Sequence, residues 1–205
     1  MSPDEEDLDD LRLPIVQAGD PVLRRPTRLV PVDELGSDRI QRLIDAMIAT
    51  VSGAGVGLAA PQVGVDLRIA VIEDPPEYHA FLPDDLLEAQ DRTPVERYVL
   101  INPELTVVDA TPAEWFEGCL SVDGYRAIVP RAVAVHVRAI DRDGEPFEVD
   151  ATGWHARILQ HEIDHLDGCL YVDRMLTRTL VDSGSYSERW GGDAIDHVKA
   201  LFGAD

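Results

Sequence analysis

Apolar residues recur at intervals of three and four positions in two stretches of the chain, a spacing typical of amphipathic helices. The first stretch has apolar residues at 40, 43, 44, 47, 48 and 51, and it follows Ser37, a favourable N-cap. The second stretch is predicted to be a helix over 153–166, with Thr152 as its cap and Gly168 as its end. The first helix requires no role beyond packing of the core.

Runs with the composition of β-strands lie between the two predicted helices. They cover 67–72, 98–108, 125–129 and 132–140, with a bend at Asn102-Pro103, and a turn at 141–144 leads into a further strand at 145–149. Residues 74–97 contain prolines and acidic residues in quick succession, which predicts a long surface loop or insert. The pattern therefore predicts an α+β fold with one early helix, several antiparallel strands and one central helix.

The chain has 205 residues, which suits one globular domain. It carries 39 acidic and 18 basic residues and a net charge of -21, so its surface repels phosphate backbones and direct nucleic-acid binding is not expected. No apolar stretch approaches the about 20 residues that span a membrane. Residues 1–10 form an acidic segment, predicted to be a disordered tail, without the pattern of a secretory signal or a transit peptide. We therefore expect a cytoplasmic protein with no membrane contact.

The central helix contains the sequence HEIDH at 161–165. Positions i and i+4 share one face of a helix, so His161 and His165 can bind the same metal ion. Glu162 lies beside them as a candidate general base. Asp164 is a candidate for orienting one of the ligand imidazoles, although an acidic residue at this position is also typical of a solvated helix face.

A third metal ligand is needed, and a lone cysteine upstream is the best candidate. By itself Cys119 would be interpreted as a small buried apolar residue, because free cysteines are commonly buried. Beside a site with two histidines, its thiolate is a strong ligand for zinc or ferrous iron. The second cysteine, Cys169, follows the metal helix directly and is interpreted as a packing residue.

A glycine-rich segment at 55–64 lacks the spacing of nucleotide-binding loops, so phosphate binding is not expected. Glycines 55, 57 and 64 instead allow the backbone to approach a ligand closely. Within this segment Gln62 offers a neutral amide that can donate a hydrogen bond to a developing oxyanion.

Three separated segments, taken together and in this order, resemble the motifs of the peptide deformylases. They are GVGLAAPQ at 55–62, EGCLS at 117–121 and QHEIDHLDG at 160–168. The resemblance covers about residues 11–175 and excludes both ends of the chain. It predicts a catalytic domain over 11–176 and a C-terminal extension over 177–205.

The resemblance implies an α+β fold in which antiparallel sheets surround a central helix that carries the metal-binding histidines. It implies a metal-dependent hydrolase that removes the N-formyl group from the N-terminal formylmethionine of new polypeptides and releases formate. The implied substrates are nascent peptides, so a transient encounter with the ribosome is expected. The implied metal is ferrous iron (Fe2+), with Ni2+, Co2+ or Zn2+ as substitutes, although the ligand types alone permit zinc equally well.

The resemblance also implies roles for individual residues. Cys119, His161 and His165 would hold the metal, and Glu162 would be the catalytic acid and base. The side chain of Gln62 and the backbone N–H of Leu120 would form the oxyanion hole.

The cleft itself is less clearly defined by the sequence. Gly55, Val56 and Gly57 are expected to pair with an extended peptide as a strand does. Trp154 and Ile158 lie on the inner face of the metal helix, and either line the pocket for the methionine side chain or belong to the core.

One departure from the family pattern concerns the rim of the cleft. Many bacterial members have proline after the Ser-Val of the cysteine motif, whereas here Asp123-Gly124-Tyr125 follows. This variant and the 74–97 insert are similar to the organellar-type branch, and Asp123 and Tyr125 are expected to alter the rim.

Two other functions are compatible with the helix motif. A zinc-type metalloprotease would use the same histidines and glutamate with a different third ligand. A binding protein with a structural metal is a second alternative, but structural zinc sites normally have four protein ligands and only three are evident.

Overall fold

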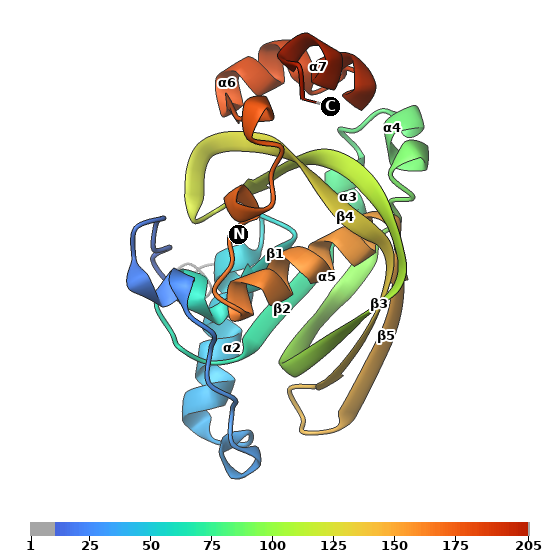
Figure 1. Ribbon diagram of the computed structural model, residues 1–205. Helices are drawn as coiled ribbons and strands as arrows, with labels where there is room; N and C mark the ends of the chain where they lie inside the picture. Colours follow the sequence, from blue (N-terminus) through green and yellow to red (C-terminus); the bar gives the residue numbers. More distant parts are fainter. Residues whose placement is uncertain (1–10, 205) are drawn as a thin grey trace, which may run out of the picture.

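The computed structural model describes residues 11–204, so the predicted acidic tail lies outside the described residues. The antiparallel sheet has the order β1-β2-β3-β4-β5, with β6 paired to β4 (Figure 1). Its strands are β1 (Gly57–Ala59), β2 (Ile69–Asp74), β3 (Val95–Cys119), β4 (Val122–Ile140), β5 (Pro146–Thr152) and β6 (Val181–Asp182). The α-helices are α2 (Asp38–Val51), α3 (Pro76–His79), α4 (Asp84–Ala89), α5 (Gly153–Leu166), α6 (Ser183–Ser185) and α7 (Ile195–Phe202). The 3-10 helices are η1 (Pro21–Arg24), η2 (Val32–Glu34), η3 (Ala60–Val63), η4 (Tyr171–Asp173) and η5 (Thr177–Thr179), and the π-helical turn η6 covers Tyr186–Trp190.

Strand β2 explains how the two main helices are held. All six of its residues are buried, because successive side chains point to opposite faces and each face is covered. Ile69 and Val71 pack in the cluster that contains the apolar face of α2, whereas Ala70 and Ile72 pack in the cluster that contains α5. The sheet therefore separates two apolar cores, one for each helix.

Strands β3 and β4 form a long ribbon that arches over α5 (Figure 1). The first part of β3 pairs with β2, and its later part, from Glu104 onward, pairs only with β4. Asn102 has a φ of 53°, and the register shifts between Ile101 and Glu104, so the ribbon bends where the sequence predicted a bend. This arch places the end of β3 above the middle of α5.

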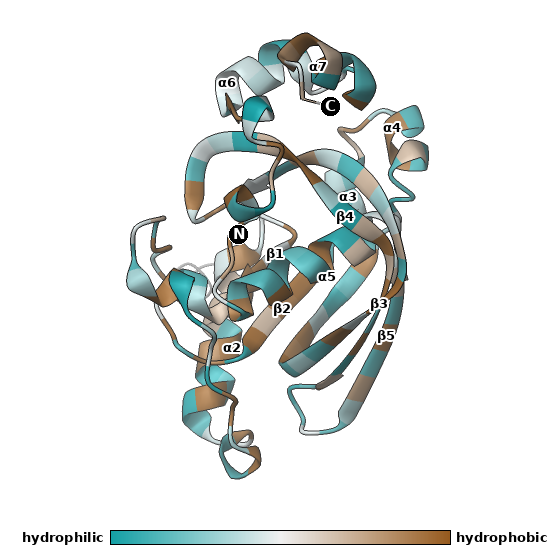
Figure 2. Cartoon of the chain, viewed as in Figure 1, coloured by the Kyte–Doolittle hydropathy of each residue, from teal (hydrophilic) through white to brown (hydrophobic). Residues whose placement is uncertain are grey.

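Both predicted helices are present with the predicted bounds, and the α+β fold is confirmed. The Ser37 hydroxyl accepts from the N–H of Ile40, as a capping residue does. Thr152 precedes α5 but does not cap it, because its hydroxyl donates to Asp91 at 2.6 Å. Both apolar and polar residues occur along α2 and along the long strands of the sheet (Figure 2).

The predicted strands at 98–108, 125–129 and 132–140 are shorter than the observed ones, since they belong to β3 and to a single continuous β4. No helix among residues 11–204 combines the length and the apolarity needed to cross a bilayer.

The predicted surface loop or insert over 74–97 lies mostly at the surface, since residues 75–94 other than Gln90 are exposed or half-exposed, but it is not a loop throughout. This stretch contains α3 and α4 and begins with Asp74, whose side chain is fully buried. The carboxylate of Asp74 accepts two hydrogen bonds from Arg92, both at 2.8 Å. This buried pair fixes the ends of the insert. No local pattern could indicate it, because the partners are 18 residues apart.

Candidate active site

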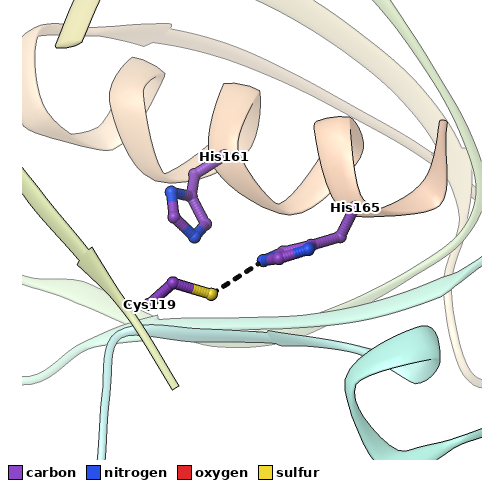
Figure 3. Close-up of side chains that lie close together, drawn as sticks. All are labelled: Cys119, His161 and His165. Atoms are coloured by element: carbon purple, nitrogen blue, oxygen red, sulfur yellow. Dashed lines mark hydrogen bonds between the residues drawn. The ribbon is translucent and has the colours of Figure 1, made fainter. Parts of the chain in front are cut away.

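Cys119, His161 and His165 come together from two elements (Figure 3). Cys119 is the last residue of β3, directly before the tight turn into β4, and both histidines project from α5. One ligand atom from each residue lies within 4.8 Å of the others. Cys119 Sγ lies 3.2 Å from His165 Nε2. The histidine spacing and the tight turn of β3 therefore place the predicted ligands around one point.

The donor set fits a divalent transition metal. It combines one sulfur and two imidazole nitrogens, which suit zinc and ferrous iron. The sulfur also accepts from two N–H donors, the backbone of Ser121 at 3.4 Å and the Gln62 amide at 3.5 Å. Within residues 11–204 no fourth histidine, cysteine or carboxylate joins this group. Three protein ligands leave a coordination position for a reactant, as in catalytic sites.

The residue that orients His161 is Glu117. The prediction that Asp164 orients one of the ligand imidazoles is wrong, because within residues 11–204 it bonds to neither of them. Nδ1 of His161 lies 2.9 Å from Glu117 Oε2, which leaves Nε2 for the metal. Asp164 instead accepts hydrogen bonds from Arg131 and Arg174.

Glu117 is the centre of a buried charge network. Its carboxylate accepts from Arg131 at 2.9 and 3.0 Å and from Arg157 at 2.6 Å. Burial alone would raise the pKa of Glu117, but the charge of Arg131 and the hydrogen bonds from His161 and Arg131 hold that pKa well below its ordinary value. The carboxylate therefore stays ionised beside the metal ligand.

No role was predicted for Glu117, Arg131 or Arg157, although the sequence contains a signal for two of them. Glu117 lies two positions before Cys119 on the same strand, so both side chains share one face. Arg157 lies four positions before His161 on the same helix, so these side chains also share a face.

Replacing Glu117 by glutamine should weaken both the fold and the metal site. The variant leaves the buried Arg157 guanidinium without its counter-ion and leaves Arg131 with Asp164 alone, which should cost about 3–5 kcal/mol of unfolding free energy. Loss of the carboxylate partner of His161 should lower metal affinity about 10–100-fold. Urea denaturation and a competitive chelator titration measure the two effects. Glu104→Gln is the matched control, because its partner Arg138 is exposed, and it should change stability by less than about 1 kcal/mol. A Glu117 variant no weaker than this control would contradict the account.

Glu162 projects beside the metal ligands and is 4% exposed. Burial raises the pKa of its carboxyl to about 7, an effect that a cation held by the neighbouring ligands would oppose. Its Oε2 has no hydrogen-bond partner among residues 11–204. A buried carboxyl with one free oxygen and a pKa near neutrality can accept a proton and release it again.

Gly57 makes room for this carboxylate. An ideal Cβ at position 57 would lie 2.6 Å from Cδ and 2.7 Å from Cγ of Glu162, closer than real Cβ contacts. The glycine of β1 therefore lets the backbone pass directly beside the candidate general base.

Gln62 is also turned toward the cluster. Its side chain is buried, and its Oε1 accepts from the N–H of Ala59 at 2.8 Å. This bond fixes the amide, so that Nε2 is the end that points to Cys119. The orientation is the one that the predicted oxyanion donor requires. Leu120 lines the same cleft, and the role of its N–H stays a prediction.

The cluster lies in a cleft of about 570 Å³ that Gly55, Val56 and Gly57 also line. Trp154 and Ile158 both line it, so the structure brings the two predicted pocket residues to the metal site. Ile158 is also part of the apolar core beside α5. It therefore serves both of the uses that the sequence left open.

The insert closes the Trp154 end of the cleft. The Arg92 guanidinium lies 4.8 Å from the centroid of the Trp154 ring, and the backbone N–H of Trp154 donates to the carbonyl of Gln90 at 2.9 Å. The Gln90 side chain is 8% exposed. Residues that had been expected on the surface thus form a wall of the site.

At the opposite rim, Asp123 and Tyr125 line the cleft as expected. Tyr125 is 50% exposed, and the N–H of Asp123 donates to Gln17 at 3.2 Å. Cys169 lies outside the metal cluster.

Comparison with known proteins identifies a match over most of the chain. The family model described as polypeptide deformylase matches residues 12–180. The chain is 54% identical to peptide deformylase 1A, chloroplastic, of Solanum lycopersicum over 167 residues, which are 81% of this chain and 60% of that protein. It is 46% identical to peptide deformylase 3 of Streptomyces avermitilis over 193 residues, covering 93% of this chain and 84% of that one. The chain therefore spans about 60% of the length of its tomato relative.

A solved structure has the same fold. It is the Met-Ala-Ser-bound class I type b peptide deformylase of Acinetobacter baumannii, with a TM-score of 0.70 and 36% identity. The match covers 80% of this chain and 98% of that one.

Proposed function

The chain belongs to the polypeptide deformylase family, and from that membership and the geometry of its cleft we propose that it hydrolyses the N-formyl group of formylmethionyl peptides. The products are formate and a peptide with a free amino terminus. One observation supports this activity most strongly: three metal ligands, a buried carboxyl and an oriented amide converge in one cleft. The similarity to a plant organellar member agrees with the predicted likeness to the organellar-type branch of the family.

We assign Cys119, His161 and His165 as the ligands of one divalent metal ion, and ferrous iron as that ion on the family likeness. When bound, the metal supplies a Lewis acid that lowers the pKa of water toward neutrality and polarises the formyl carbonyl. Elemental analysis of protein purified without oxygen tests this assignment. One iron per chain is the expected result, and one zinc per chain would change the metal while leaving the ligands unchanged.

The proton transfers belong to Glu162. Its carboxylate takes a proton from the water that attacks the formyl carbon. As the C–N bond breaks, the same carboxyl returns the proton to the departing amine. The free Oε2 and the burial of this side chain support the role, because both keep the carboxyl available and its pKa near neutrality.

The negative charge that develops on the formyl oxygen requires donors. We assign Nε2 of Gln62 and the N–H of Leu120 to this task. In comparable sites each such donor stabilises the transition state by about 2.7–4 kcal/mol. The Ala59 hydrogen bond supports the Gln62 assignment, since it holds the amide in the donating orientation before substrate arrives.

The peptide is held in an extended form beside β1. Gly55, Val56 and Gly57 line the cleft, and their backbone is suited to pair with the substrate as an added strand. The methionine side chain then enters the end formed by Trp154 and Ile158. The Acinetobacter baumannii relative was solved with Met-Ala-Ser bound, a product of the kind that this reaction would release.

Replacing Gly57 by alanine should reduce turnover by about 100-fold, because the new Cβ forces the Glu162 carboxyl away from its position and misplacements of about 1 Å have effects of this size. Steady-state formate release with formyl-Met-Ala measures the effect, and thermal unfolding reports on the fold. Gly36→Ala is the matched control, since a Cβ there meets no atom within 4 Å. Equal turnover in the two variants would show that Gly57 does not position Glu162.

The alternative activity, cleavage of internal peptide bonds by a metalloprotease, finds no support in the family match. Nascent chains are the proposed partners, with a transient ribosome encounter. A cytoplasmic location also stays a proposal, since the tomato relative is named chloroplastic and residues 1–10 lie outside the described residues.

The activity is tested with two dipeptides that differ only at the amino terminus. Formyl-Met-Ala should release formate, whereas acetyl-Met-Ala, with its larger acyl group, should release little acetate. Absence of formate release from protein that contains a full complement of metal would contradict the proposed function.

A further inference from the structure

The C-terminal part of the chain reaches the cleft. Residues 183–195, here called the C-terminal wall, cover α6, η6 and the start of α7. They lie beyond residue 180, where the match to the family model ends. The wall residues that line the cleft are Ser183, Tyr186, Trp190, Gly191, Asp193 and Ile195. In Figure 1 this segment lies above the arch of β3 and β4.

The wall is a packed part of the fold. Strand β6 pairs with Tyr125 and Arg126 of β4, which anchors the start of the segment. The Asp182 carboxylate then accepts from the N–H of Ser185 at 2.9 Å. The ring of Tyr186 packs edge-on against Phe116, with centroids 5.0 Å apart.

The end of the segment is anchored as well. The ring of Trp190 packs against Phe202 of α7, with centroids 5.3 Å apart. Val198 of α7 is fully buried in the same apolar cluster, beside Ile128 of β4. Both aromatic rings of the wall are therefore held in place before any peptide arrives.

A chain of contacts connects the wall to the reaction centre. Arg126 pairs across the ribbon with Gly118, the residue before Cys119. Its guanidinium lies over the Tyr186 ring, 4.8 Å from the centroid, and 3.3 Å from where a Cβ of Gly118 would be. Within residues 11–204, Arg126 forms no ion pair. Tyr186 thus holds the Arg126 guanidinium at the rim, opposite the residue that precedes the metal ligand Cys119.

The two ends of the cleft differ in burial. At the Trp154 end, Gln90 and Ile158 are 8% and 3% exposed, so this end is closed and suits one side chain. The wall is open, because Tyr186 and Trp190 are half-buried and Asp193 is exposed. A peptide whose first side chain fills the closed end must continue toward the open end.

The residues after the formylated one would extend the peptide along the cleft. An extended chain advances about 3.3–3.6 Å per residue, so three further residues span about 10 Å beyond the formylated one. The aromatic rings of the wall offer apolar area to those residues, and the Arg126 guanidinium offers donors to their carbonyl groups.

We propose that the C-terminal wall binds the residues that follow formylmethionine, and that Tyr186 and Trp190 make the enzyme favour longer peptides over a formylated dipeptide. This inference rests on the proposed deformylase activity. The substrate class is therefore a formylated peptide of at least three residues in extended form.

The test compares kcat/KM for formyl-Met-Ala-Ser-Ala with kcat/KM for formyl-Met-Ala in the full chain. Tyr186→Ala and Trp190→Ala should each lower the ratio of kcat/KM for the longer peptide to kcat/KM for the dipeptide about five- to tenfold. The change should come mainly from a higher KM for the longer peptide. Tyr186→Phe retains the ring beneath Arg126 and should keep the ratio within about twofold.

Leu201→Ala is the matched control, because this residue of α7 is 58% exposed and does not line the cleft. Its ratio should equal that of the wild type. Thermal unfolding of each variant identifies any that is not folded. A ratio unchanged in both alanine variants, or an equal loss with both peptides, would overturn the role of the wall. No formate from either peptide with the wild-type protein would overturn the activity itself, and the role of the wall with it.

Discussion

Replacing Glu162 by glutamine should abolish nearly all formate release while leaving the metal in place. The amide has almost the same shape but cannot take a proton from water or return one to the amine. General acid–base catalysis contributes about 10²–10⁴-fold, and we expect kcat to fall by that factor. Since Glu162 is not one of the three ligands, metal content should stay at the wild-type value. Single-turnover formate release and elemental analysis of the same sample measure both quantities.

A control variant and the measured metal content make this prediction specific to the carboxyl. Glu148→Gln, an exposed change of the same chemistry on β5, should have wild-type turnover. A Glu162→Gln protein that retains turnover would exclude the proposed proton transfers. A variant that loses its metal would show that Glu162 supports the metal site, and its low activity would then not report on proton transfer.

The second large effect is expected from Cys119→Ser. The serine hydroxyl is a poor ligand at neutral pH, so the site retains only the imidazoles of His161 and His165. Removing a group that is hydrogen-bonded to a metal ligand already lowers metal affinity by about 10–100-fold. Removing the ligand itself should therefore lower metal affinity by more than about 100-fold. Formate release should fall in parallel with metal content. Metal titration with a competing chelator measures the affinity, and circular dichroism checks the fold.

The chain offers its own control for this change. Cys169 is its only other cysteine, directly after α5 and outside the ligand group. Cys169→Ser should therefore keep the metal and the activity. Full metal occupancy in Cys119→Ser would mean that another residue is the third ligand.

The parts of the site that could be predicted are those that depend on residues close together in the sequence. The spacing of His161 and His165 places both on one face of a helix, and Ser37 and Gly168 mark helix ends by local backbone chemistry. Cys119 could be predicted as a ligand because a site with two histidines lacked a third one. These inferences need no knowledge of how distant segments pack.

The parts that could not be predicted depend on contacts between distant residues. Glu117 meets Arg157 across 40 residues, and Arg92 reaches Asp74 across 18. In the sequence each of these charges is indistinguishable from a solvated one, and only the arch of β3 and β4 buries Glu117. Asp164 was assigned to a ligand histidine for the same reason, since its sequence position near His165 does not show that Arg131 lies beside it.

The C-terminal segment gives a second example. Its serines and glycines indicate an irregular extension, and its helical pattern is weak. Its role at the cleft arises because Tyr186 packs on Phe116, 70 residues earlier in the chain. Burial of that ring is a property of the folded ribbon, so no local pattern could reveal it.

The central claim is that one metal ion held by Cys119, His161 and His165 is required for deformylation. The most direct test strips the metal without oxygen, returns ferrous iron in steps, and follows formate release from formyl-Met-Ala at each step. We predict that activity rises in proportion to bound iron, reaches its plateau at one ion per chain, and is absent from Cys119→Ser at the same iron concentration. Formate release from the stripped protein, or a plateau at a different stoichiometry, would contradict the account.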